Sequence, residues 1–294
     1  MHAPRRLRGT IVVLLSMLIV LLAAMPASAA RPLPRSISST GDSITRAFNT
    51  CTFPYIDCPR NSWSTGSSAT VNSVYLRIRA QNAAISGRAF NDARSGAKMA
   101  ELPGQMATAS GRNVNAVTVQ MGGNDVCTTS SSTMTSVEAF RASFTRAMEE
   151  ISANPNVSTV YVTSVPDAYR LWELFRGNRT ARAVWSLFRI CQSLLARPTS
   201  TATADVERRN AVRARNIAFN QVLEEVCAAF SICAFDGWAA FCTPFTTADV
   251  TSRDYFHPSV AGQRKLAGVA WRAGPWVAEP TPRLGSDCVA GTSA

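Results

Sequence analysis

Short apolar runs alternate with longer helical patterns along most of this chain, and this alternation limits the fold more than any other feature. A strand, a helix and a strand in succession predict a parallel sheet with helices on both faces. No repeat or long low-complexity linker divides them, so the sequence predicts one α/β domain over residues 30–276. We expect strands over residues 36–40, 84–90, 114–121, 157–165 and 231–235, and helices over 70–81, 136–153, 205–230 and 258–273.

The first 29 residues have the three parts of a secretory signal peptide. Arg5, Arg6 and Arg8 form a basic start, residues 11–24 are apolar, and the small residues 27–29 form a cleavage site. A membrane anchor is the alternative, but the apolar run is short and ends at a cleavable site. We therefore expect a secreted, extracellular protein whose net charge falls from +11 to +8 when the three arginines leave.

All eight cysteines lie outside this leader, and an even number in an exported chain predicts disulfides. Eight cysteines allow 105 pairings, but short spacing favours Cys51 with Cys58 and Cys227 with Cys233. Cys288 is expected to tether a C-terminal tail, residues 277–294. The remaining candidates are Cys127, Cys191 and Cys242.

Several classes of function are disfavoured by what the sequence lacks. His257 is the only histidine outside the leader, which excludes zinc sites that need two imidazoles. There is no phosphate-binding Gly-x-x-x-x-Gly-Lys-Ser/Thr motif and no Gly-x-Gly-x-x-Gly motif. Export and the absence of a clustered basic stripe argue against a nucleic-acid partner.

Three polar loops that contain glycine follow the first three predicted strands. They are Gly41-Asp42-Ser43, residues 91–96, and Gly122-Gly123-Asn124-Asp125. The carboxyl ends of parallel strands meet at one edge of a sheet, where ligands bind in folds of this kind. We therefore expect the three loops to form one site.

His257 is the candidate general base because a hydroxyl nucleophile needs one. Asp254 lies three residues before it, close enough in a tight turn to accept a hydrogen bond from the imidazole and fix its tautomer. The alternative is a capping aspartate beside an incidental surface histidine.

Ser43 is the candidate nucleophile because it follows Gly41, which permits a tight turn before a helix-like run. A serine there could instead be only a helix N-cap, and the chain lacks the Gly-x-Ser-x-Gly elbow of α/β hydrolases. The backbone N–H groups of Ser43 and Gly96 and the side-chain amide of Asn124 are candidate donors to an oxyanion.

The candidate residues fall into four sequence blocks: Gly41-Asp42-Ser43, Gly96, Gly123-x-Asn124 and Asp254-x-x-His257. Together and in this order, the four blocks resemble those of the SGNH hydrolases, also called GDSL esterases and lipases. The resemblance is greatest to the secreted actinobacterial members of that family. Ile44 stands where the family's common name implies leucine.

The resemblance implies a flavodoxin-like, three-layer α/β/α sandwich with a five-stranded parallel sheet. It also implies that Ser43 is the nucleophile, His257 the base and Asp254 its orienting carboxylate. Ser43, Gly96 and Asn124 would form the oxyanion hole, and no metal or cofactor would be required.

Residues 167–197 are the stretch that looks least like the family. They are apolar with interspersed arginines, and they could wall an acyl pocket, touch a lipid surface transiently, or pack as an amphipathic excursion on the core. The leading hypothesis is a monomeric ester hydrolase, with esterase, lipase or phospholipase activity on small-molecule or lipid esters. The alternatives are a carbohydrate acetylesterase and a non-catalytic secreted binding protein.

Overall fold

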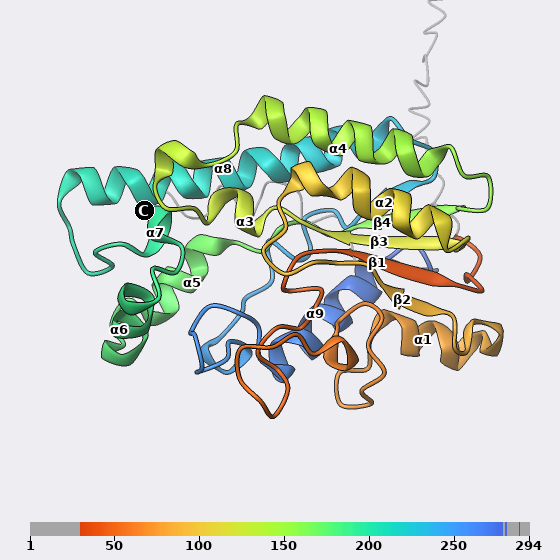
Figure 1. Cartoon of the computed structure of the whole chain (residues 1–294), viewed down its shortest axis with the longest axis horizontal. Helices are drawn as coiled ribbons and strands as arrows, with labels where there is room; N and C mark the ends of the chain where they lie inside the picture. Colours follow the sequence, from red (N-terminus) through yellow and green to blue (C-terminus); the bar gives the residue numbers. More distant parts are fainter. Residues whose placement is uncertain (1–29, 279, 281–287, 289–294) are drawn as a thin grey trace, which may run out of the picture.

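Five parallel strands form one sheet in the order β2-β1-β3-β4-β5 (Figure 1). This computed structural model describes residues 30–278, 280 and 288. The α/β prediction is therefore confirmed, including the number of strands and their parallel direction. The strands are β1 (Ile37–Gly41), β2 (Ala89–Asn91), β3 (Ala116–Gln120), β4 (Thr159–Val162) and β5 (Cys233–Phe235).

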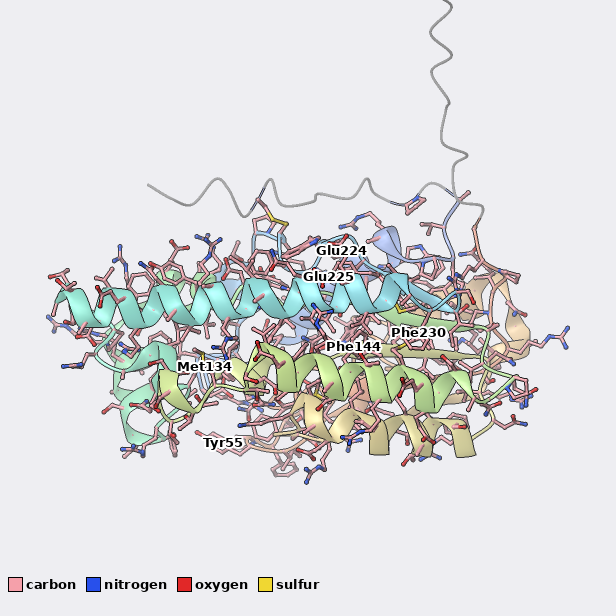
Figure 2. The ribbon with its side chains drawn as sticks, turned by 90° about the horizontal axis from the view of Figure 1, so that it is seen from above. Tyr55, Met134, Phe144, Glu224, Glu225 and Phe230 are labelled. Carbon is pink, nitrogen blue, oxygen red and sulfur yellow. A yellow bond between two sulfur atoms is a disulfide. The ribbon has the colours of Figure 1, made fainter. Side chains whose placement is uncertain are left out.

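Helices cover both faces of the sheet and make three layers. On one face lie α2 (Leu102–Gly111), α4 (Val137–Ser152) and α8 (Thr203–Ala228), of which α4 and α8 run side by side (Figures 1 and 2). On the other face lie α1 (Val74–Gln81) and α9 (Val260–Ala273). Short 3-10 helices span Pro59–Asn61, Ala83–Ile85, Met99–Glu101, Ser131–Thr133 and Thr247–Asp249.

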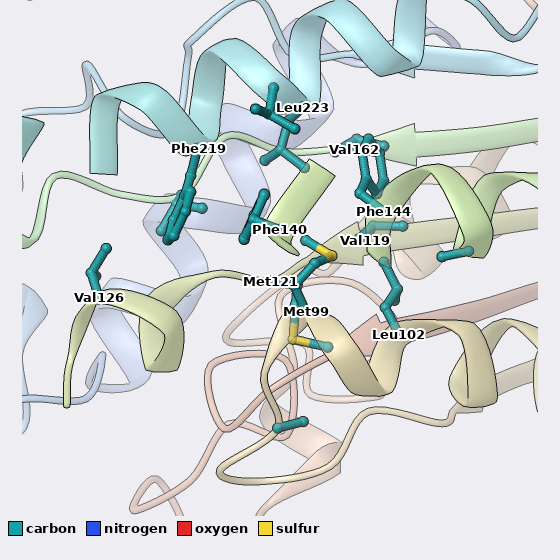
Figure 3. Close-up of a cluster of buried hydrophobic side chains, with 14 of the residues drawn as sticks. Met99, Leu102, Val119, Met121, Val126, Phe140, Phe144, Val162, Phe219 and Leu223 are labelled. Carbon is teal, nitrogen blue, oxygen red and sulfur yellow. The ribbon is translucent and has the colours of Figure 1, made fainter. Parts of the chain in front are cut away.

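Two hydrophobic clusters hold these layers together, one on each face of the sheet. Val160 and Val162 of β4 face the cluster under α4 and α8, whereas Tyr161 between them faces the cluster under α9. Phe140 of α4 and Phe219 of α8 stack with ring centroids 3.9 Å apart at the centre of the first cluster (Figure 3). Burial on both faces explains why β3 and β4 read as largely apolar runs, whereas β1 is buried through the small polar side chains of residues 38–40.

The structure differs from the sequence prediction around β2. The strand does not begin at residue 84, because Ala83–Ile85 is a 3-10 helix whose first turn is capped by Asn82. The sequence does not predict helix α2, since Pro103, Gly104 and several small residues hide its helical pattern. Residues 43–49 form consecutive turns and not the helix-like run expected after Ser43.

Residues 167–197 form three short helices at one end of the sheet (Figure 1). Helix α5 (Ala168–Phe175) begins at the side-chain cap of Asp167, and α6 (Arg179–Leu187) at that of Asn178. Helix α7 (Gln192–Leu195) follows, and α3 (Gly123–Val126) lies in the loop after β3. The stretch is thus a helical excursion from the sheet.

All eight cysteines are paired, in the disulfides Cys51–Cys58, Cys127–Cys191, Cys227–Cys233 and Cys242–Cys288. Two of these are the local pairs that short spacing favours. Cys127–Cys191 joins the end of α3 to the start of α7 across 64 residues of chain. The predicted signal peptide lies outside the described residues, and within them no helix has the length and apolarity needed to cross a membrane.

Candidate active site

The turn that carries Ser43 is fixed directly to the end of β1. Gln105 of α2 accepts a hydrogen bond from the Gly41 N–H at 2.7 Å and donates one to the Gly41 carbonyl at 2.9 Å. Gly41 has φ +143°, and a Cβ atom there would lie 2.3 Å from the carbonyl oxygen of Gln120. Only glycine fits this position, so the sharp turn into Ser43 depends on it.

His257 links Ser43 to a buried carboxylate. Its Nε2 atom lies 2.8 Å from Ser43 Oγ, and its Nδ1 atom lies 2.8 Å from Asp254 Oδ2. Asp254 Oδ1 accepts hydrogen bonds from the backbone N–H groups of Phe256 and His257 at 2.9 and 3.0 Å. With a proton on Nδ1 held by the carboxylate, Nε2 is free to accept the serine proton.

A further side chain, Asn49, completes the surroundings of this carboxylate. Its Nδ2 donates to Asp254 Oδ2, and its Oδ1 accepts from the Tyr55 N–H. Asn49 is buried and has φ +66°, a left-handed conformation that asparagine tolerates better than most residues. The sequence gives no sign of this role for Asn49, because 205 residues separate it from Asp254 and no local pattern links the two.

The two aspartates beside Ser43 and His257 have pKa values that are shifted in opposite directions. Burial acts to raise the pKa of Asp254, but the hydrogen bond and charge of His257, together with two backbone donors, hold it below its ordinary value. At Asp42 burial dominates and raises the pKa to about 7, although the Ile44 N–H and the charge of His257 act in the opposite direction. Asp254 is therefore the charged partner of the imidazole.

The candidate oxyanion donors come from three loops at the same edge of the sheet. Asn124, on α3, donates one amide hydrogen to the Ala97 carbonyl at 3.0 Å and keeps its second. The backbone N–H groups of Ser43 and Gly96 donate no hydrogen bond to any residue that the structure describes. Gly96 has φ +82° and is exposed, and it is absent from the residues that line the pocket beside Ser43.

Ser43, His257 and Asn124 open into one pocket with about 860 Å³ of empty space, part of it open to solvent. Asp254 lies behind His257 and does not line it. Most of the wall is apolar, and α5 supplies part of it. The large apolar lining residues include Val165, Leu171, Leu174, Phe245, Val250 and Phe256.

The 167–197 stretch therefore combines two of the readings that its sequence allows. Helix α5 lines the pocket through Leu171 and Leu174, whereas α6 packs on the protein through the buried residues Ala181 and Trp185. Cys127 also lines the pocket. Its disulfide to Cys191 ties the start of α7 to the end of α3, the helix that carries Asn124.

No group of three or more histidine, cysteine, aspartate or glutamate side chains among the described residues could hold a metal ion. The arrangement of Ser43, His257, Asp254 and Asn124 has the parts needed for acyl transfer, namely a hydroxyl, a base, an oriented carboxylate and a nearby N–H donor.

Comparison with solved structures finds an extracellular lipase from Streptomyces rimosus, 17% identical with a TM-score of 0.47, over 81% of this chain and 99% of that chain. It also finds a family 3 carbohydrate esterase from Clostridium thermocellum, 14% identical with a TM-score of 0.44, over 80% of this chain and 92% of that chain. None of the curated proteins matches the chain.

The sequence model of the GDSL-like lipase/acylhydrolase family matches residues 40–265, more than half of the 294 residues. The matched region begins before Ser43 and ends after His257, so it contains all four sequence blocks on which the resemblance was based. This chain belongs to the GDSL-like lipase/acylhydrolase family.

Proposed function

We propose that this protein is a secreted serine carboxylic-ester hydrolase that forms an acyl-enzyme on Ser43 and acts on esterase, lipase or phospholipase substrates. The observation that supports it is the continuous chain of hydrogen bonds from Asp254 through His257 to Ser43, at the floor of an apolar-walled pocket. A mere N-cap serine or a surface histidine would need no such chain.

In the first half-reaction, Ser43 Oγ attacks the ester carbonyl carbon while His257 Nε2 takes the hydroxyl proton. The negative charge that develops on the carbonyl oxygen is held by the free amide hydrogen of Asn124 and by the N–H groups of Ser43 and Gly96. The C–O bond to the alcohol then breaks, His257 returns the proton to the leaving alkoxide, and the acyl group remains on Ser43.

In the second half-reaction, His257 takes a proton from water as the water attacks the acyl carbon. Collapse of this second tetrahedral intermediate releases the carboxylic acid and restores the serine hydroxyl. Asp254 stays ionised throughout, in agreement with its lowered pKa, and balances the positive charge on the imidazole in each half-reaction.

The walls of the pocket favour acyl groups longer than acetate. Leu171 and Leu174 of α5, with Val165 in the segment between β4 and α5, offer apolar surface beside the nucleophile. A methyl group would leave much of this surface in water, whereas a longer alkyl chain would cover it.

The test is hydrolysis of p-nitrophenyl esters from acetate to palmitate by the oxidised protein beside its Ser43→Ala variant. We expect the parent to cleave medium and long esters faster than acetate and the variant to lose several powers of ten in turnover. Cleavage confined to acetate would favour the carbohydrate acetylesterase alternative. Equal rates for parent and variant at every chain length would refute Ser43 as the nucleophile.

A further inference from the structure

Exposed apolar side chains are concentrated on one part of this molecule. Of the six large hydrophobic side chains that are exposed among the described residues, five come from two segments. We call these five the ledge: Phe53, Tyr55 and Ile56 in the loop closed by Cys51–Cys58, and Leu187 and Phe188 at the end of α6.

The two segments form a single surface. The rings of Tyr55 and Phe188 lie with their centroids 6.0 Å apart. Tyr55 stands at the margin of the molecule (Figure 2). Phe53 and Leu187 are the most exposed members, with 73% and 76% of their surfaces open to solvent. Single exposed apolar side chains are ordinary, but five from two segments that meet through Tyr55 and Phe188 mark an interaction surface.

Both halves of the ledge are attached to the turn that carries Asp254 and His257. The Arg253 guanidinium donates hydrogen bonds to the carbonyls of residues 51–53 in the disulfide loop, at 2.6 to 3.1 Å, and to the Asn49 carbonyl just before the loop at 3.0 Å. On the other side, Trp185 Nε1 of α6 donates to the Tyr255 carbonyl at 3.1 Å. The ledge is therefore held in a fixed position next to the active site.

The charge around the ledge is strongly positive. Residues 168–197 contain six arginines and a single acid, Glu173. Arg176, Arg179 and Arg189 are exposed, and no carboxylate of the described residues forms an ion pair with any of them. An exposed apolar surface flanked by arginines that pair with no carboxylate is complementary to an anionic lipid surface, which has phosphates at its surface and apolar chains beneath them.

We propose that the ledge docks this protein on anionic lipid surfaces. Phe53 and Leu187 enter the boundary between headgroups and acyl chains, while the arginines of α6 and its flanks bind headgroup phosphates. Because the ledge is bonded to the catalytic turn, docking brings the pocket to its lipid substrate. The proposal rests on the proposed ester hydrolase function for this consequence, but docking itself needs no hydrolysis.

The test uses the full oxidised protein with Ser43→Ala, so that no lipid is consumed, in sedimentation with vesicles. The two vesicle types are phosphatidylcholine alone and an equal mixture with phosphatidylglycerol. We expect binding to the anionic vesicles that weakens with salt. Adding Phe53→Ser and Leu187→Ser should weaken it about ten- to a hundredfold. Arg176→Gln with Arg179→Gln should weaken it about fivefold per arginine on anionic vesicles.

Val206→Ser is the matched control, because Val206 is the sixth exposed apolar residue and lies on α8. It should bind like the parent, and the melting temperatures should agree among all variants. Two results would overturn the proposal: absence of binding to anionic vesicles, or equal binding by the ledge and control variants. Dissociation of a dimer by the ledge variant, with vesicle binding unchanged, would assign the surface to a second copy of the chain instead.

The ester series with the Ser43 protein tests the other proposal separately. Vesicle binding without hydrolysis of any ester would refute the hydrolase proposal and leave the docking surface intact. Hydrolysis of soluble esters without vesicle binding would refute the docking surface and leave the hydrolase proposal intact.

Discussion

The turn after β1 and the turn before α9 each hold a buried aspartate beside Ser43 and His257. The pKa values of these two aspartates are shifted in opposite directions. Asp42 is 1% exposed and Asp254 is 4% exposed, so both are almost fully removed from solvent. Yet the pKa of Asp42 is raised to about 7, whereas that of Asp254 is held below its ordinary value.

The number of donors explains this difference. Asp254 accepts from two backbone N–H groups, from the imidazole and from the Asn49 amide. Asp42 accepts one hydrogen bond from a neighbour, the Ile44 N–H, and also lies within the field of the buried carboxylate of Asp125. Burial alone therefore does not determine the charge of a carboxyl group, because the donors that replace water decide whether it stays ionised.

The largest effect is expected from Asp254→Asn. An amide cannot balance the charge of a protonated imidazole, and its Nδ2 group can turn the ring toward the wrong tautomer. We expect a loss of about 10⁴-fold in kcat for p-nitrophenyl butyrate at pH 8. The same substitution at Asp42 should keep kcat within about tenfold of the parent, because Asp42 accepts a hydrogen bond from the Ile44 N–H and none from the imidazole. Equal losses in both variants would contradict the distinction between the two turns.

Asp42→Asn should change stability instead, in a manner that depends on pH. Between its ordinary pKa of 3.8 and its folded pKa of about 7, the folded protein keeps a proton that the unfolded chain has released. Stability therefore falls as the pH rises through this window, and the full penalty is present above it. The asparagine variant has no such penalty. Its stability advantage over the parent should grow by about 2 to 3 kcal/mol from pH 5 to pH 8.

Urea unfolding of both proteins with disulfides intact measures this difference. The comparison removes the contribution of other buried acids, such as Asp236, whose pKa is raised to about 6 by burial, because both proteins contain them. Parallel stability curves for the two proteins would show that Asp42 ionises in the fold without cost.

Much of this site could be predicted from the sequence because its parts are coded locally. Ser43, Gly96 and Asn124 each follow a strand, and the parallel-sheet rule brings the ends of those strands together. The three-residue spacing of Asp254 and His257 in one turn also predicts their contact. Gly96 as an oxyanion donor remains a prediction.

The parts that could not be predicted depend on contacts between distant segments. Asn49 meets Asp254, and Arg253 meets the loop closed by Cys51–Cys58, but each pair is separated by about 200 residues. The apolar pattern of residues 167–197 has the same form whether a side chain faces the core, the pocket or solvent. Leu174 and Leu187 show this, since the first lines the pocket and the second is exposed.

The smallest of the predicted effects concerns Asn49, whose side-chain amide donates a hydrogen bond to Asp254 in the turn before α9. Asn49→Gly keeps the left-handed backbone but removes the hydrogen bond to Asp254. Since the carboxylate keeps its other donors, we expect a loss of about tenfold in kcat. Asn49→Asp sets a second carboxyl against Asp254, and the pair carries more negative charge than the native aspartate once its shared proton is lost, which favours the charged imidazole. The acid limb of the kcat/KM profile should therefore move to higher pH.

Asn61→Ala is the matched control for a purely structural role. Asn61 is also buried and also holds this loop, through a hydrogen bond to the Thr50 carbonyl at 3.1 Å, but it has no contact with Asp254. Loosening the loop alone would lower activity in both variants without moving the acid limb. A shifted limb in Asn49→Asp and an unshifted one in Asn61→Ala would locate the effect at the carboxylate, whereas identical profiles would mean that Asn49 only supports the loop.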